Sequence, residues 1–321
     1  MDHPLNRTDA IAFPKSFSSS DPTQVISLCT QINSTEGNVV LDASELEFID
    51  PMGLAALRAT LESLPDEKKY HVRWMREHLI EYLIRMDFFQ NLDVDGVDTS
   101  MDPLADPDNC VELVRVDDGK SEEIASRLVH AMFGCDDVGT DQDPYRKPIE
   151  YALKELLENA LSHARKEGRG GASVWVACQH FPTNGTVRIA IVDNGCGFLA
   201  TLKEHHQLPE QSHSAAIQTA LLPRVSCNRG PLVAYETDSQ NQGVGLTTTA
   251  KIAEAAGGTL IVASGNAWVH TASGATSVDP QLDWHGVAIA FSCNRDMLPL
   301  VNIPALLPAV EGEVDDEISF E

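Results

Sequence analysis

Three short polar motifs, each beside an apolar segment, constrain the fold of the second half of this chain more than any other feature. The first, ELLENALSHA, has the spacing of a helix. The second, IAIVDNGCGF, ends an apolar strand, and the third, NQGVGLTTTA, places two glycines before a helix. Strand patterns lie between them, so this half of the chain is predicted to combine helices and strands.

The first motif carries a polar stripe along one side of the expected helix. Glu155, Asn159 and His163 are spaced by four, so successive side chains lie roughly 40° apart around the axis. Taken alone, such a stripe is more typical of a solvated helix edge than of a binding site. The apolar positions predict the buried side of the same helix: Leu153, Leu156, Leu157 and Ala160.

The second and third motifs suit an amine and an anion respectively. The carboxylate of Asp193, at a strand end, can accept a hydrogen bond from an exocyclic amine, and Gly195 and Gly197 allow a close backbone approach. Gly243 and Gly245 precede a helix, where backbone amides and the helix dipole attract anions. Each pattern is weak by itself, since glycine-rich turns and helix caps are common.

Together and in this order, the motifs resemble the Bergerat-type ATP-binding fold of the gyrase, Hsp90, histidine kinase and MutL superfamily, over roughly residues 146–293. The resemblance implies an α/β sandwich with helices on one face of a mixed sheet. It implies ATP and Mg²⁺ as cofactors, Asp193 as the partner of the adenine amine, and residues 199–242 as a lid over ATP. The cofactor-binding residues that it implies are Asn159, which would also hold Mg²⁺, His163, Asp193, Gly195, Gly197, Gly243, Val244, Gly245 and Leu246.

Two further positions refine the resemblance. Glu155 is similar to the glutamate of gyrase-like ATPases and anti-sigma-factor serine kinases, which implies a catalytic general base acting on water or on a hydroxyl. The chain departs from many relatives at Gly286-Val287, where a Gly-Thr pair is usual. Nucleotide affinity would then be weaker, or another hydroxyl such as that of Thr259 would substitute.

The segment VVLDASELEFIDPMGLAALRA, within residues 22–97, resembles the STAS fold of anti-anti-sigma factors, an α/β domain. Asp50 and Gly53 match the strand-to-helix turn of that fold, but Pro51 occupies the slot of the phosphorylatable residue. Since proline has no hydroxyl, we expect this turn to be a docking surface and not a phosphorylation substrate. The alternative is an ordinary strand-to-helix turn of a small α/β domain.

Charge and composition exclude some classes of partner. The net charge of −25 argues against binding to nucleic acid or to an anionic membrane. No apolar run approaches the roughly 20 residues of a membrane span, and the N-terminus lacks a signal-peptide pattern. The seven cysteines are scattered singly and odd in number, which indicates reduced thiols in the cytoplasm.

The two resemblances together imply a regulatory signalling protein that binds ATP with Mg²⁺ and hydrolyses it or transfers its phosphoryl group. The expected partner is a protein, of a STAS or sigma-regulatory type, or a second copy in a homodimer. The alternatives are a non-catalytic, nucleotide-gated binding module and a serine/threonine kinase of anti-sigma type. The expected ranges are a disordered N-terminus (1–21), a STAS-like domain (22–97), a linker and lead-in (98–120), an ATPase domain (121–300) and an acidic tail (301–321).

Overall fold

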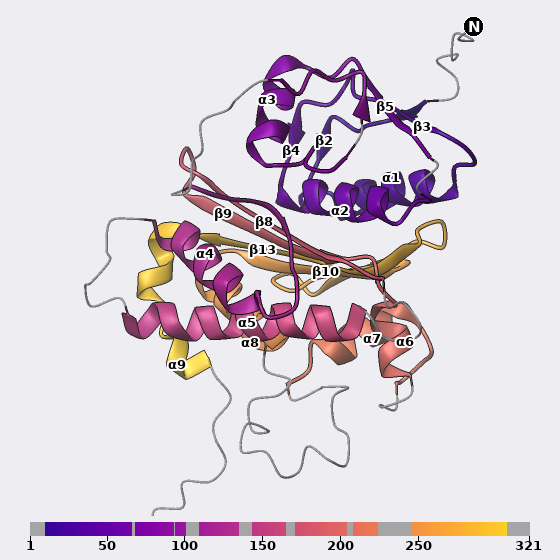
Figure 1. The fold of residues 1–321 in the computed structure, drawn as a ribbon. Helices are drawn as coiled ribbons and strands as arrows, with labels where there is room; N and C mark the ends of the chain where they lie inside the picture. The colour runs from indigo at the N-terminus through magenta and orange to yellow at the C-terminus, as the bar shows by residue number, and fades with distance from the viewer. Residues whose placement is uncertain are drawn as a thin grey trace, which may run out of the picture.

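The computed structural model describes residues 10–65, 68–92, 94–100, 109–134, 143–164, 171–203, 208–223 and 245–306 of the 321-residue chain. These residues form an N-terminal unit, residues 10–100, and a C-terminal unit, residues 109–306, which lie one above the other (Figure 1). None of the helices in the described residues combines the length and the apolar character that a membrane span requires.

The N-terminal unit is built on a four-stranded parallel sheet in the order β1-β3-β5-β6. The strands are β1 (Ile11–Ala12), β3 (Val39–Asp42), β5 (Tyr70–Arg73) and β6 (Val94–Asp95), and β2 (Ser16–Phe17) pairs separately with β4 (Phe48–Ile49). The helices are α1 (Pro22–Ser34), α2 (Pro51–Glu62) and α3 (Glu77–Arg85). Strands and helices alternate along this unit, as expected for a small α/β domain.

The FIDPMG turn, residues 48–53, leads into α2, and the hydrogen bonds at the start of this helix explain why a proline is tolerated at position 51. The carboxylate of Asp50 accepts hydrogen bonds from the amides of Met52 (3.0 Å) and Gly53 (3.1 Å). Such a cap satisfies amides that a helix leaves unpaired, and a proline at the first helical position has no amide to lose. Pro51 is buried, so the slot that the sequence led us to expect on an exposed turn is not accessible.

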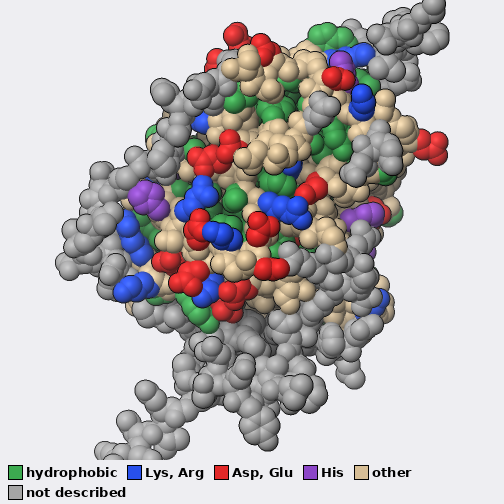
Figure 2. Space-filling view, in the orientation of Figure 1, with side chains coloured by type: hydrophobic (Ala, Val, Ile, Leu, Met, Phe, Trp, Pro, Cys, Tyr) green, Lys and Arg blue, Asp and Glu red, His purple; other side chains and the backbone are tan. Residues whose placement is uncertain are grey.

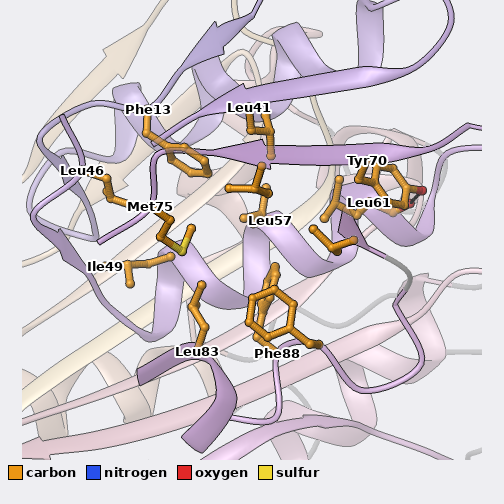
Figure 3. A pocket seen from close by; sticks show the side chains of 13 residues that line it. Phe13, Leu41, Leu46, Ile49, Leu57, Leu61, Tyr70, Met75, Leu83 and Phe88 are labelled. Carbon is orange, nitrogen blue, oxygen red and sulfur yellow. Dashed lines mark hydrogen bonds between the residues drawn. The ribbon is translucent and has the colours of Figure 1, made fainter. Parts of the chain in front are cut away.

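The core of the N-terminal unit lies between its sheet and the helices α2 and α3. In Figure 3, Leu41 of β3, Leu57 of α2 and Leu83 of α3 point toward one another around a small apolar cavity. The cavity volume is about 10 Å³, which is at most enough for a single water molecule. This region is therefore a packed core and not a ligand pocket.

The C-terminal unit is built on a seven-stranded sheet in the order β12-β11-β10-β13-β9-β8-β7. Its strands are β7 (Cys110–Arg115), β8 (Val174–Phe181), β9 (Thr186–Asp193), β10 (Thr259–Gly265), β11 (Ala267–His270), β12 (Ala275–Val278) and β13 (Trp284–Asn294). Its helices are α4 (Ser121–Phe133), α5 (Asp143–Ala164), α6 (Gly197–Leu202), α7 (His213–Ala220), α8 (Gly245–Ala255), the 3-10 helix η4 (Arg295–Leu300) and α9 (Ile303–Leu306).

The α/β sandwich expected for this unit is confirmed, with α4, α5 and α8 on one face of the sheet (Figure 1). One detail differs. Every pairing between the described strands of this sheet is antiparallel, so the sheet is not mixed. On the side seen in Figure 2, acidic and basic side chains are interspersed, and the pairs Arg127–Glu112 (2.7 Å) and Lys154–Glu122 (3.1 Å) lie on or beside α4.

The N-terminal unit covers the opposite face of the seven-stranded sheet, with α2 against β8, β9 and β13. Side chains alternate between the two faces of a strand, and the residues of this sheet alternate accordingly. The face toward α4, α5 and α8 carries mainly Val and Ile, whereas the face toward α2 carries many alanines. These alanines are Ala177, Ala190, Ala263, Ala288 and Ala290. Small side chains allow α2 to pack closely against the sheet.

One charged contact joins the FIDPMG turn to this sheet. Arg188 of β9 donates to the buried carboxylate of Asp50 at 2.9 Å, and the Asp50 side chain is only 1% exposed. The turn therefore contacts the chain's own C-terminal unit, and its expected role as a docking surface for a partner stays a prediction.

Some elements differ from those that the sequence predicted. The segment EHLIEYLIRMDFFQNL has the pattern of a single helix, but α3 ends at Arg85, because Asp87 takes a left-handed conformation with φ of 55°. Pro148 suits the first turn of a helix that begins there, but α5 already begins at Asp143, so this proline lies inside it. Strand β7 lies within the expected lead-in and forms an edge of the sheet. The expected lid includes α7 and most of α6, and the hairpin of β11 and β12 was not predicted.

Candidate functional site

Helix α5 carries the first motif and forms one side of the candidate site. Leu153, Leu156 and Leu157 are buried against the sheet, which confirms the expected core side of the helix. Glu155 and Asn159 are half-buried on the edge of this side. The side chain of His163 lies outside the described residues, so its predicted role in cofactor binding stays a prediction.

The second motif forms a tight turn at the end of β9, and its acidic side chain is buried. Asp193 is 4% exposed, and its Oδ1 accepts a hydrogen bond from the amide of Gly195 at 2.9 Å. Burial raises the pKa of the Asp193 carboxyl to about 7, while the backbone amides of Gly195 and Val287 act in the opposite direction. Within the described part of the chain this carboxylate has no charged partner, which suits it to accept hydrogen bonds from a neutral amine.

Glycines allow this turn to fit between α5 and β13. A Cβ on Gly195 would come within 2.4 Å of the Cα and the carbonyl oxygen of Ala164, at the end of α5. Gly286 of β13 has a φ of 110°, and a Cβ there would come within 2.2 Å of the Asp193 carbonyl oxygen. Gly195 and Gly286 are therefore required by the packing of the protein itself, which fixes the position of the Asp193 carboxyl.

The third motif meets the first in the middle of α5. Gly245 is the first residue of α8, and the position of its Cβ would lie 3.5 Å from the amide nitrogen of Leu156 and 3.6 Å from the Cβ of Glu155. Leu246 is partly buried against the same core as α5. Gly243 and Val244 lie outside the described residues. The structure thus brings the described part of this motif beside the proposed catalytic residue.

Helix α5 sets the distance between the two ends of the candidate site. Gly195 packs on Ala164 and Gly245 packs beside Glu155, nine residues earlier. At about 1.5 Å per residue, these contacts lie roughly 13–14 Å apart along the helix. One end offers the start of a helix, which favours an anion, and the other offers a buried carboxylate. The arrangement suits an elongated ligand with a polyanionic end and an amine-bearing end.

A buried hydroxyl that the sequence reasoning missed supports the Asp193 turn. Val287 occupies the position where a threonine was considered, and Ser264, at the end of β10, is fully buried beside it. The Oγ of Ser264 donates to the carbonyl of Gly286 at 2.8 Å and accepts from the amide of Phe198 at 3.2 Å. Ser264 thereby links the end of β10 to Gly286 of β13 and to the start of α6, which follows the Asp193 turn.

Thr259, the residue considered as a substitute for the missing threonine, does not serve this role. It starts β10 and pairs with Ser292, at the opposite end of the strand from Ser264. Because β10 and β13 are antiparallel, the end of β10 lies beside the start of β13. Ser264 is brought to Gly286 by this strand pairing and not by a local sequence pattern.

The described residues form no metal site from His, Cys, Asp or Glu side chains alone. Among them, no group of three or more His, Cys, Asp or Glu side chains is arranged to bind a metal ion. The ring of His213 is close-packed, because a Cβ on Gly265 would come within 2.2 Å of its Nδ1. Burial lowers the pKa of this imidazole. A metal at Asn159, as the resemblance implies, would need phosphate oxygens and water to complete its coordination.

Comparison with known families supports the assignment of these three motifs. Residues 145–279 match the family model described as histidine kinase-, DNA gyrase B- and HSP90-like ATPase. The match covers less than half of the 321 residues and runs from the start of α5 through the hairpin of β11 and β12. Searches of curated proteins and of solved structures gave no significant match. The family match supports the Bergerat-type fold and connects this part of the chain with ATP-binding domains.

Proposed function

We propose that the C-terminal unit binds ATP with Mg²⁺ along α5, with adenine at Asp193 and the phosphates at the start of α8. The observation that carries this proposal is the contact of α5 with both other motifs, Gly245 at Glu155 and Gly195 at Ala164. Asn159 lies between these contacts on the same helix. The family match to residues 145–279 supports the same assignment.

The chemistry of the residues present fits the two ends of a nucleotide. Among the described residues, the buried carboxylate of Asp193 contacts backbone amides and no charged side chain, and the adenine amine would supply donors to it. The amides at the start of α8 suit the phosphates. Bound Mg²⁺ would neutralise phosphate charge, and the amide oxygen of Asn159 would be its protein ligand.

Glu155 is the residue proposed to act on the reacting groups. It would accept a proton from water in hydrolysis, or from a serine or threonine hydroxyl in phosphotransfer. Its position beside Gly245 puts it at the phosphate end of the proposed site. Incubation with labelled ATP distinguishes the two reactions, since hydrolysis releases free phosphate and phosphotransfer labels a protein.

The N-terminal unit is proposed to be a STAS-like regulatory domain, in a cytoplasmic signalling protein that acts on a protein partner. Its parallel sheet and the Asp50-capped turn that opens α2 support this proposal. Pro51 has no hydroxyl and is buried, so the turn itself is not proposed as a kinase substrate. A partner hydroxyl would have to come from another protein or from a second copy of the chain.

A non-catalytic binding module is the second candidate, and Val287 favours it. This side chain is 9% exposed and brings no hydroxyl to the base end of the site. Nucleotide would then be a ligand that alters a surface, without turnover. The two candidates share the same nucleotide site and differ in whether Glu155 has a chemical role.

The test of nucleotide binding is a titration of the whole chain with ATP in the presence and absence of Mg²⁺, followed by calorimetry. Asp193→Asn keeps the size of the side chain but replaces one acceptor oxygen by a donor. A lost or mispaired hydrogen bond costs about 1–3 kcal/mol, so we expect affinity to fall roughly tenfold to a hundredfold. Equal affinity of wild type and Asp193→Asn would contradict the adenine assignment.

A further inference from the structure

The turn that carries Asp193 is attached directly to α2 of the N-terminal unit. The next residue, Asn194, donates from Nδ2 to the carbonyl of Ala59 in α2 at 3.1 Å. Its Oδ1 accepts from the amide of Ser173 at 2.8 Å, and the Asn194 side chain is buried. One side chain therefore connects the second motif with a helix more than one hundred residues earlier in the chain.

A second contact from α2 reaches the same turn through Ser173. Glu62, three residues after Ala59, accepts through Oε2 from the Ser173 hydroxyl and from the indole of Trp175, both at 2.6 Å. Its Oε1 pairs with Arg115 at 3.1 Å. The carbonyl of Ser173 in turn accepts from the amide of Asn194 at 3.3 Å. Ser173 is 2% exposed. These hydrogen bonds form a closed ring. It runs from Glu62 of α2 to Ser173, from Ser173 to Asn194, and from Asn194 back to Ala59 of α2.

The two neighbouring residues of the turn face different partners. Asp193 contacts Gly195, Gly286 and Val287 of the candidate site, whereas Asn194 contacts α2 and Ser173. The turn thus lies between the proposed base site and the N-terminal unit. Because Asp193 and Asn194 are consecutive residues, a shift of α2 that moves Asn194 would also move the backbone that carries the Asp193 carboxyl.

We propose that Asn194, Ser173 and Glu62 are positioning residues through which the docked N-terminal unit holds the Asp193 turn and sets the affinity of the nucleotide site. The second half of this statement rests on the proposed function. Coupling of this kind is reciprocal. Nucleotide binding at Asp193 must therefore strengthen the docking of α2 by the same factor by which docking strengthens nucleotide binding.

The first variants to test are at Glu62, because a substitution on α2 leaves the turn's own sequence intact. Glu62→Ala removes the acceptor of Ser173 and Trp175, whereas Glu62→Gln retains an acceptor oxygen and loses only the charge. Glu112→Ala is a matched control, since it breaks a glutamate–arginine pair, with Arg127 at 2.7 Å, that does not involve α2. Asn194→Asp is a second, independent variant that keeps the acceptor for Ser173 and removes the donor to Ala59.

The first measurement is hydrogen–deuterium exchange of the peptide that spans residues 192–198, in the full chain without nucleotide. Exchange reports local opening of such a segment. We expect it to be about fivefold or more faster in Glu62→Ala and in Asn194→Asp, and close to wild type in Glu62→Gln and Glu112→Ala. Unchanged exchange in both Glu62→Ala and Asn194→Asp would overturn the positioning role, whether or not the protein binds ATP.

The second measurement is the affinity for ADP with Mg²⁺ by calorimetry. We expect Glu62→Ala to bind about tenfold more weakly, the equivalent of about 1.4 kcal/mol, and Glu62→Gln to restore most of the loss. Wild type that fails to bind would refute the proposed function and, with it, the second half of this proposal, while the exchange result still decides the first half. Faster exchange with unchanged affinity would refute the coupling and leave the nucleotide site in place. If thermal denaturation shows that Glu62→Ala is unfolded, the same measurements on Asn194→Asp decide whether the proposal holds.

Discussion

At the scale of single residues, Asp193 has the least ordinary environment in the candidate site. Its carboxyl is buried at the end of β9, and within the described part of the chain its partners are backbone amides and not charged groups. Burial raises its pKa to about 7, because the charged form loses water. A perturbed carboxyl of this kind is typical of functional sites, although buried structural groups also show it.

The raised pKa of Asp193 predicts a specific dependence of stability on pH. The folded state retains the proton up to about pH 7, whereas an unfolded chain loses it near pH ~3.9. The folded state therefore binds more protons in this window, and this carboxyl destabilises the wild type increasingly as pH rises through it. From pH 5 to pH 8, we expect Asp193→Asn to gain roughly 2–3 kcal/mol relative to wild type.

Urea denaturation at several pH values measures this gain. Asp193→Ala is the control, since it also lacks the carboxyl but leaves a small cavity. Both variants should show the same change of stability difference with pH and differ only by a constant offset. A stability difference that stays the same between pH 5 and pH 8 would show that Asp193 is not protonated in the folded protein.

Glu155 provides the second prediction at this scale, and it separates the two candidate functions. We expect Glu155→Ala to retain nucleotide binding and to lose turnover by about 10² to 10⁴, as is usual for a missing general base. Calorimetry measures the first quantity and release of labelled phosphate measures the second. Turnover at the wild-type rate in Glu155→Ala would make the catalytic assignment wrong, and no turnover in wild type would favour the binding module.

At the scale of elements, the motif-bearing parts of the site were predictable and their supports were not. The apolar strand pattern before Asp193 and the helical spacing around Glu155 gave β9 and α5. Strand β12 was missed because it is largely exposed and polar, ATSV, and carries no apolar alternation. Ser264 was missed because its role depends on the antiparallel register of β10 and β13, which the sequence does not state.

The contact between the Asp193 turn and α5 gives a prediction at this scale. A Cβ on Gly195 would collide with the backbone of Ala164, whereas a Cβ on Gly171 would meet nothing within 4 Å. Neither glycine has a left-handed φ, so the two differ in available space. We expect Gly195→Ala to destabilise the fold by about 1–3 kcal/mol or more, and Gly171→Ala to change stability by roughly 0.5 kcal/mol or less.

Thermal and urea denaturation of the two glycine variants measure this difference. Nucleotide affinity should fall in Gly195→Ala as well, because the displaced turn carries Asp193. If Gly195→Ala were as stable as Gly171→Ala, the close packing of this turn on α5 would be wrong.

At the scale of the whole molecule, the sequence indicated that the C-terminal sheet is covered but not by what. The runs VWVAC, IAIV and VAIAF are apolar at consecutive positions, which is typical of strands buried on both faces. The family resemblance implied that helices cover one face of this sheet. The cover on the other face is α2, and the charged contact that joins them lies between residues 138 positions apart. Such a pairing has no local signal in a single sequence.

The contact between Asp50 and Arg188 gives the last prediction, on the joining of the two units. Removing one partner of a buried ion pair typically costs about 3–5 kcal/mol, because the other charge is left unpaired. Asp50 keeps hydrogen bonds from Ser19 and from the start of α2, so we expect about 2–4 kcal/mol for Arg188→Ala. The half-exposed Arg127–Glu112 pair supplies the control Arg127→Ala, for which about 1 kcal/mol or less is expected.

The double variant Asp50→Asn with Arg188→Ala separates the loss of the pair from the burial of an unpaired charge. Asparagine still caps a helix, so α2 retains its start while no buried charge is left alone. We therefore expect the double variant to be more stable than Arg188→Ala, with the coupling measured by a double-mutant cycle in urea. Additive effects of the two substitutions would mean that the pair does not hold the N-terminal unit on the sheet. In that case the attachment would rest on the apolar packing of α2 and on the ring of hydrogen bonds at Asn194, which lies at the end of the same strand β9.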